Sequence, residues 1–66
     1  MNSLFDVILS EVRIAANNPD NYRDGSLVWE FVDADVYAYV NPTEDCVSTF
    51  YALFEQACNI VEKELA

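Results

Sequence analysis

The 66-residue sequence contains no histidine, a single glycine and only three basic residues. Without histidine, the usual base that activates a serine or cysteine nucleophile is missing. One glycine is too few for a glycine-rich phosphate-binding loop. Three bases cannot form the basic face that direct binding to nucleic acid or anionic lipid requires. The sequence therefore favours a binding protein over an enzyme, and no cofactor is expected.

Features of a metal site, a disulfide or a membrane span are equally scarce. Asp33 and Asp35 have the alternate spacing of calcium-loop ligands, but the turn glycine and the distal glutamate of such a loop are missing. Cys46 and Cys58 are expected on one helix, about 18 Å apart, which is too far for a disulfide. No leader segment opens the chain, and no apolar run approaches the roughly 20 residues of a membrane span. We expect a cytoplasmic protein that binds no metal.

Acidic residues dominate the charge. Twelve acids oppose three bases, which gives a net charge of −9 and a pI near 4.1. No basic residue lies between Arg23 and Lys63, and residues 26–45 hold five of the acids. Gathering like charges on a small fold costs self-repulsion, so either solubility or a basic partner must favour them. Both explanations remain open from the sequence alone.

The length and the apolar content predict one domain over residues 1–66. Hydrophobic residues make up 53% of the chain and aromatic residues 14%, so disorder is not expected. A chain of this size buries only about 60% of the surface that its unfolded form exposes. Such a domain must use nearly all its apolar side chains or share surface with a partner.

The first segment predicts a helix over about residues 3–17. Ser3 is a plausible N-cap, and Asp6 favours the positive end of the helix dipole. The helical period places one group of apolar residues on a core-facing stripe: Leu4, Phe5, Ile8, Leu9, Val12, Ala15 and Ala16. Val7 and Ile14 fall on the opposite side, as a second contact surface. Residues 17–25 are rich in asparagine and contain proline and glycine, which predicts a loop.

The middle segment, residues 27–40, is almost wholly β-branched or aromatic. This composition predicts an antiparallel hairpin with strands at 27–32 and 36–40, joined by a turn at Asp33-Ala34-Asp35. The alternative is a helix from Ser26 to Val40. That helix would place Glu30, Asp33 and Asp35 at scattered angles with no clean polar face, so strands are preferred.

The last segment predicts a helix over about residues 43–64. Asn41 or Thr43 can cap it, Pro42 suits the first turn, and Glu44 and Asp45 favour its positive end. Its apolar face comprises Val47, Phe50, Tyr51, Phe54, Ala57, Cys58, Val61 and Leu65, extended by Leu53 and Ile60. The expected fold class is therefore α+β, in αββα order, with a two-stranded antiparallel hairpin packed on two helices.

A small, acidic, aromatic-rich chain of this kind resembles the phage-encoded inhibitors known as anti-CRISPR and anti-restriction proteins, several of which mimic DNA. The likeness covers the whole chain in size, charge and style. It is carried by a base-free acidic set: Asp24, Glu30, Asp33, Asp35, Glu44, Asp45, Glu55 and Glu62. The resemblance implies an inhibitor that catalyses nothing and works in the host cytoplasm. Its partner would be a basic nucleic-acid-binding protein or complex, for example a CRISPR surveillance complex, with no direct contact to nucleic acid.

Seven of these acids are the predicted partner-binding residues: Glu30, Asp33, Asp35, Glu44, Asp45, Glu55 and Glu62. They would meet the lysines and arginines that normally contact phosphates. The second hypothesis is a small structural or adaptor protein that buries an apolar surface against another chain. That surface would be Val7 and Ile14, or the valine face of the predicted hairpin, which comprises Val28, Val32, Val36, Ala38 and Val40. The sequence is compatible with a monomer or a homodimer.

Overall fold

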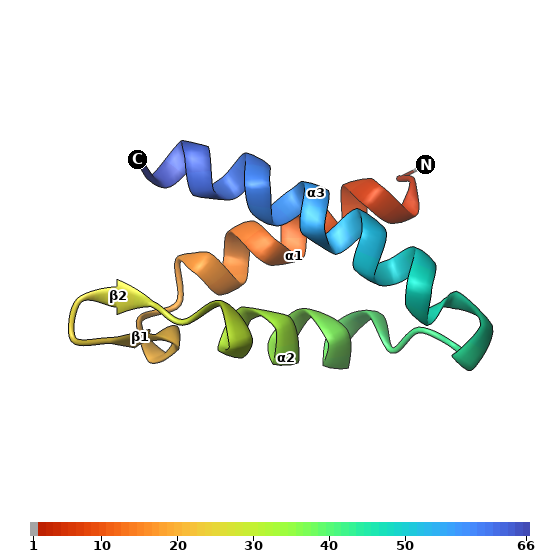
Figure 1. Ribbon diagram of the computed structural model, residues 1–66, viewed down its shortest axis with the longest axis horizontal. Helices are drawn as coiled ribbons and strands as arrows, with labels where there is room; N and C mark the ends of the chain where they lie inside the picture. Colours follow the sequence, from red (N-terminus) through yellow and green to blue (C-terminus); the bar gives the residue numbers. More distant parts are fainter. Residues whose placement is uncertain (1) are drawn as a thin grey trace.

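The computed structural model describes residues 2–66, which form a mixed α+β fold that is mostly helical (Figure 1). Three helices surround a short core, and a two-stranded antiparallel hairpin closes one end. The elements in chain order are α1 (Leu4–Ala16), the 3-10 turn η1 (Pro19–Asn21), β1 (Tyr22–Arg23), β2 (Ser26–Leu27), α2 (Trp29–Val40), the 3-10 turn η2 (Glu44–Cys46) and α3 (Val47–Leu65).

The predicted start of α1 is confirmed, and it is a reciprocal capping box. The Ser3 hydroxyl accepts a hydrogen bond from the Asp6 backbone N–H at 3.1 Å, and the Asp6 carboxylate accepts one from the Ser3 N–H at 3.3 Å. Together they satisfy two of the donors that every helix start leaves free. Asn17 ends the helix, and its side-chain amide donates to the Arg13 carbonyl at 2.8 Å.

The hairpin of the structure lies within and just after the predicted loop. Tyr22 pairs with Leu27, and Arg23 with Ser26, around the two-residue turn Asp24-Gly25. Both turn residues have positive φ, 54° and 81°, as a type I′ turn requires. Asp-Gly is among the strongest local signals for such a turn, and the prediction of a plain loop overlooked it.

The predicted hairpin over residues 27–40 is wrong, because residues 29–40 form the continuous helix α2. The αββα order is wrong with it, since a helix separates the true hairpin from α3. The stretch predicted as the hairpin turn, Asp33-Ala34-Asp35, lies in the middle of α2. Of the two residues expected to cap the last helix, Asn41 instead ends α2 in the left-handed conformation with φ 47°, and Thr43 is the N-cap of η2 but makes no side-chain cap bond.

Two valines one helical turn apart explain why this segment is a helix. Val32 and Val36 are 0% and 1% exposed, and Trp29 and Val40 extend their stripe along α2. Valine in a helix costs only a few tenths of a kcal/mol relative to leucine, whereas burying its side chain gains about 1.5 kcal/mol or more. Burial against α1 therefore outweighs the local preference for strands.

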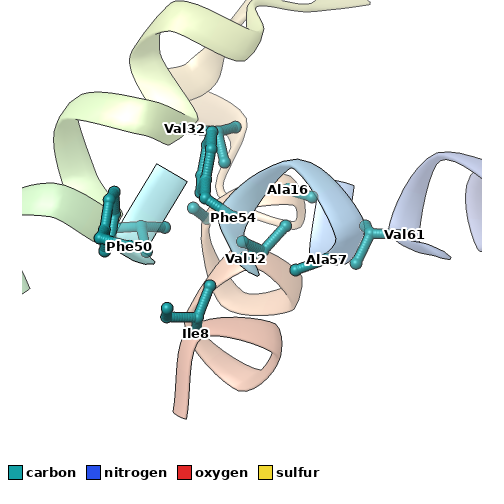
Figure 2. Packing of buried hydrophobic residues seen from close by; sticks show 10 residues of the cluster. Ile8, Val12, Ala16, Val32, Phe50, Phe54, Ala57 and Val61 are labelled. Atoms are coloured by element: carbon teal, nitrogen blue, oxygen red, sulfur yellow. The ribbon is translucent and has the colours of Figure 1, made fainter. Parts of the chain in front are cut away.

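The core forms where α1 packs against both α2 and α3 (Figure 2). Its members come from all three helices: Ile8, Val12, Ala15, Ala16, Val32, Val36, Phe50, Phe54, Ala57 and Val61. Most of the predicted α1 stripe is confirmed as core or core edge, but Leu4 is 40% exposed. The fold is elongated, 36 Å in its longest dimension and 20 by 18 Å in the others.

A buried asparagine joins the segments at the hairpin end. Asn21 is 5% exposed, and its side-chain amide donates to the Ala15 carbonyl at 2.8 Å and to the Asp35 carboxylate at 2.9 Å. Its backbone carbonyl accepts from the Val28 N–H at 2.9 Å. Close by, the Tyr22 hydroxyl donates to the Ala16 carbonyl at 2.7 Å. These bonds satisfy carbonyls at the end of α1 and connect α1, the hairpin and α2.

Asn21→Ala should destabilise the fold by about 2–4 kcal/mol, because it leaves a buried carbonyl without its donor and removes a bond to a carboxylate. The matched control is Asn17→Ala, which removes an exposed bond to a helix carbonyl and should cost less than about 1 kcal/mol. Urea unfolding followed by far-ultraviolet circular dichroism measures both. Equal costs for the two variants would contradict the role given to Asn21.

Ala34→Pro should destabilise the protein by about 3 kcal/mol or more, because proline breaks a helix interior. The same substitution in a hairpin turn would be tolerated. Ala34→Gly is the control, and it should cost only about 1 kcal/mol at this exposed helical position. Thermal melts of the two variants decide the matter, and a stable Ala34→Pro variant would rule out a continuous α2.

Candidate acidic binding surface

The seven predicted partner-binding acids lie in several parts of the fold. Glu30 lies in the first turn of α2, and Glu44 and Asp45 lie in η2, where the chain turns from α2 to α3. Asp33 and Asp35 are in α2, and Glu55 and Glu62 in α3. All are exposed except Asp33, which is half-buried. They therefore do not form one continuous patch.

Asp33 and Asp35 were expected together at a hairpin tip, and that expectation is wrong. Two residues apart on a helix, they point to opposite flanks of α2. Asp33 accepts a hydrogen bond from the Tyr51 hydroxyl of α3 at 3.1 Å, whereas Asp35 accepts from buried Asn21. Each carboxylate thus connects α2 to a different neighbour. Asp35 holds the fold together and cannot be reversed in charge without cost.

Three of the predicted acids gather around Cys58 on one side of α3. Burial first, and then the charges of Asp33, Glu62 and Glu55, raise the pKa of the Cys58 thiol from its ordinary 9.0 to about 11. Glu55 and Glu62 are seven residues apart, which places them on the same side of the helix. Asp33 reaches this side from α2, where its carboxylate accepts a hydrogen bond from the Tyr51 hydroxyl. The structure therefore brings together acids that are 29 positions apart in the sequence, from 33 to 62.

Aromatic side chains border this acidic group at the end nearest η2. Tyr51 stacks on Tyr37 with ring centroids 6.0 Å apart, and its edge meets Phe50 at 5.0 Å. Loss of hydration and the hydrogen bond to Asp33 raise the pKa of the Tyr51 hydroxyl. Tyr51 remains 40% exposed, so an aromatic ring lies beside the carboxylates at the surface. Its role was not predicted, because the sequence placed Asp33 in a turn.

The two arginines are engaged within the protein. Arg13 binds Glu64 through two contacts, Nε to Oε1 at 3.0 Å and a second guanidinium nitrogen to Oε2 at 2.6 Å. This bond raises the pKa of Arg13 and lowers that of Glu64. Arg23 lies 4.9 Å from the centre of the Phe31 ring and donates to the backbone carbonyls of Asp20 in η1 and Tyr22 in β1. Neither arginine is paired with any of the seven acids.

Within residues 2–66, Arg13–Glu64 is the only ion pair. Among these residues, five of the seven acids also have no hydrogen-bond partner for their carboxylates: Glu30, Glu44, Asp45, Glu55 and Glu62. Their charges face solvent without compensation, as a surface that binds cations requires.

The described part of the chain has no enclosed pocket, and its acids, together with its cysteines, nowhere form a group of three or more suited to hold a metal ion. Both cysteines are free, Cys46 at the surface and Cys58 half-buried. Across residues 2–66 every helix is too short or too polar to cross a bilayer.

Comparison of the chain with models of known protein families, with curated proteins and with solved structures finds no match.

In a Cys46→Ser variant, alkylation of Cys58 should follow a pKa of about 11, instead of the ordinary 9.0. At pH 9 only about 1% of such a thiol is the reactive thiolate. Asp33→Asn removes one negative charge and should lower the pKa, but it should stay above 9.0 because burial is the largest cause. Iodoacetamide rates across pH 7–11 measure the shift. An ordinary value in the folded protein would contradict the placement of Cys58.

The raised pKa of Cys58 makes the stability of the fold depend on pH. The folded-state pKa of Cys58 is above its ordinary value of 9.0, so its neutral form stabilises the fold fully below about pH 9. This contribution is lost as the pH rises toward about 11.

Proposed function

We propose that this protein is a non-enzymatic inhibitor that binds a basic nucleic-acid-binding surface of a partner and blocks nucleic-acid recognition there. It would act as the small acidic phage inhibitors do, by offering carboxylates where phosphates normally lie. A host defence complex such as a CRISPR surveillance complex is the partner class that this proposal names. The protein itself would contact no nucleic acid and need no cofactor.

The observation that supports the proposal is the set of five uncompensated carboxylates. They project from helical elements and the tight turn between them, so their spacing is constrained. The arginines that could have neutralised them are used elsewhere, in the Arg13–Glu64 pair and in the Arg23 contacts of the hairpin. Acidic groups of fixed spacing attract a basic partner at long range and select among partners by geometry.

A second candidate function rests on apolar side chains of α1. Ile14 is 61% exposed and lies two helical turns after half-buried Val7, on the side of α1 away from the core stripe. Such a stripe could bind another protein or a second copy of this chain. In a homodimer, however, two chains of net charge −9 would repel each other. The valine face of the predicted hairpin no longer contributes, because Val32 and Val36 are buried.

The double variant Glu55→Gln/Glu62→Gln tests the acidic surface. We expect it to bind nucleic-acid-binding proteins of a defence-competent bacterial lysate about tenfold more weakly than the parent, with a smaller dependence on salt. The immobilised full chain is the bait, and mass spectrometry identifies the bound proteins. A DNA oligonucleotide should displace them, since both compete for the same basic surface.

The control variant Asp20→Asn/Glu11→Gln removes two charges outside the seven predicted residues, so the two variants have the same net charge. It should bind nearly as the parent does. If salt and DNA leave the capture unchanged but Ile14→Asp abolishes it, the acidic-inhibitor proposal is wrong and the apolar adaptor is favoured. Equal loss in both charge variants would show that net charge alone matters.

A further inference from the structure

We infer that one flank of α3 is the docking site for a basic amphipathic helix of the partner. This docking flank consists of Tyr51, Glu55, Cys58, Glu62 and Leu65, with Asp33 facing it from α2. The inference rests on the proposed function and adds the secondary structure and chemistry of the element that the partner would present.

The apolar members of the docking flank have heptad spacing. Tyr51, Cys58 and Leu65 follow one another at intervals of seven residues, so they form one line along the helix. Phe54 and Val61, three residues after the first two, are 9% and 2% exposed and fill the core of the protein itself. These five residues form one apolar stripe, in which Phe54 and Val61 face the core and Tyr51 and Leu65 lie at the exposed edge.

Toward the C-terminal end of α3, α2 no longer lies beside the docking flank (Figure 1). α2 and α3 meet near η2 and separate toward their other ends (Figure 1). Near the meeting point Tyr51 contacts Tyr37 and Asp33 of α2, yet it is still 40% exposed. Farther along, Cys58 is half-buried and packs against the core, whereas Leu65 is 46% exposed. The line from Tyr51 to Leu65 is about 21 Å long, which matches four turns of a docked helix.

The charges beside this line require a basic occupant. Glu55 and Glu62 each follow an apolar member by four residues, which is the position from which coiled-coil helices form salt bridges to a partner. Asp33 adds a third negative charge at the Tyr51 end of the line, where its carboxylate accepts a hydrogen bond from the Tyr51 hydroxyl at 3.1 Å. At 100° per residue, Lys63 lies about 100° around α3 from Glu62, away from this flank. A second copy of this chain or a nucleic acid would meet repulsion here, whereas an amphipathic helix with lysine or arginine beside its apolar stripe would not.

The probe is a synthetic peptide of about three heptads, with leucine at two positions of each heptad and lysine at the flanking ones. A scrambled peptide of the same composition is the control for charge alone. Titration of the isotope-labelled full chain, followed by NMR, should shift the signals of residues 51–65 and of Asp33 most strongly. The scrambled peptide should bind about tenfold more weakly, because it cannot place its leucines along the docking flank.

Two matched variants locate the contact. Leu65→Asp puts a charge into the apolar line near the end of α3, whereas Ile14→Asp makes the same kind of change at an exposed position of α1. We expect Leu65→Asp to weaken peptide binding about tenfold and Ile14→Asp to leave it unchanged. Circular dichroism of both variants verifies that the fold is intact. If Leu65→Asp unfolds the chain, Leu65→Ser takes its place in the same comparison.

Any of three results would overturn the docking flank. The two peptides could bind equally, the two variants could lose equal affinity, or the NMR shifts could spread over every acidic residue. The failure of this inference differs from failure of the proposed function. If peptide binding shows no preference for the docking flank but Glu55→Gln/Glu62→Gln still reduces DNA-displaceable capture from lysate, the proposed function stands and the docked helix is wrong. If that capture is also absent, both are wrong.

Discussion

The arrangement of the helices depends on the side-chain amide of Asn21. This is the one buried polar side chain among the described residues, and both of its bonds cross between segments, to the end of α1 and to Asp35 of α2. A buried amide without partners would cost more than it contributes, so the geometry around it is strongly constrained. The amide connects the end of α1 to α2, and the backbone carbonyl of Asn21 accepts a hydrogen bond from the Val28 N–H where the hairpin closes.

The sequence predicted the elements whose causes are local. The Ser3–Asp6 box and a clear amphipathic period specify α1, and the same kind of period specifies α3, so both helices were expected within a few residues of their observed bounds. The α2 segment has no such signals: its N-cap residue Val28 makes no side-chain cap, and exposed Phe31 and Tyr39 leave it apolar nearly all round. Its helical state is decided by tertiary contacts, which a reading of residue preferences does not contain.

The sequence named the acids of the candidate surface but misplaced two of them. No basic residue lies between Arg23 and Lys63, and within residues 2–66 Glu55 and Glu62 form no ion pair. Asp33 and Asp35 were misplaced because the error in secondary structure put both on a turn. In the helix, a period of 3.6 residues directs Asp33 to Tyr51 and Asp35 to Asn21, so the two aspartates contact different parts of the fold.

The elongated shape also sets how densely the protein displays its charge. A net charge of −9 along a 36 Å axis is about one charge per 4 Å. Double-stranded DNA carries one per about 1.7 Å of its axis, and each of its strands one per about 3.4 Å. In line density of charge the protein thus corresponds to one strand of nucleic acid. A basic channel shaped for a duplex would keep about half of its cations unneutralised, whereas one that follows a single strand would be matched nearly charge for charge.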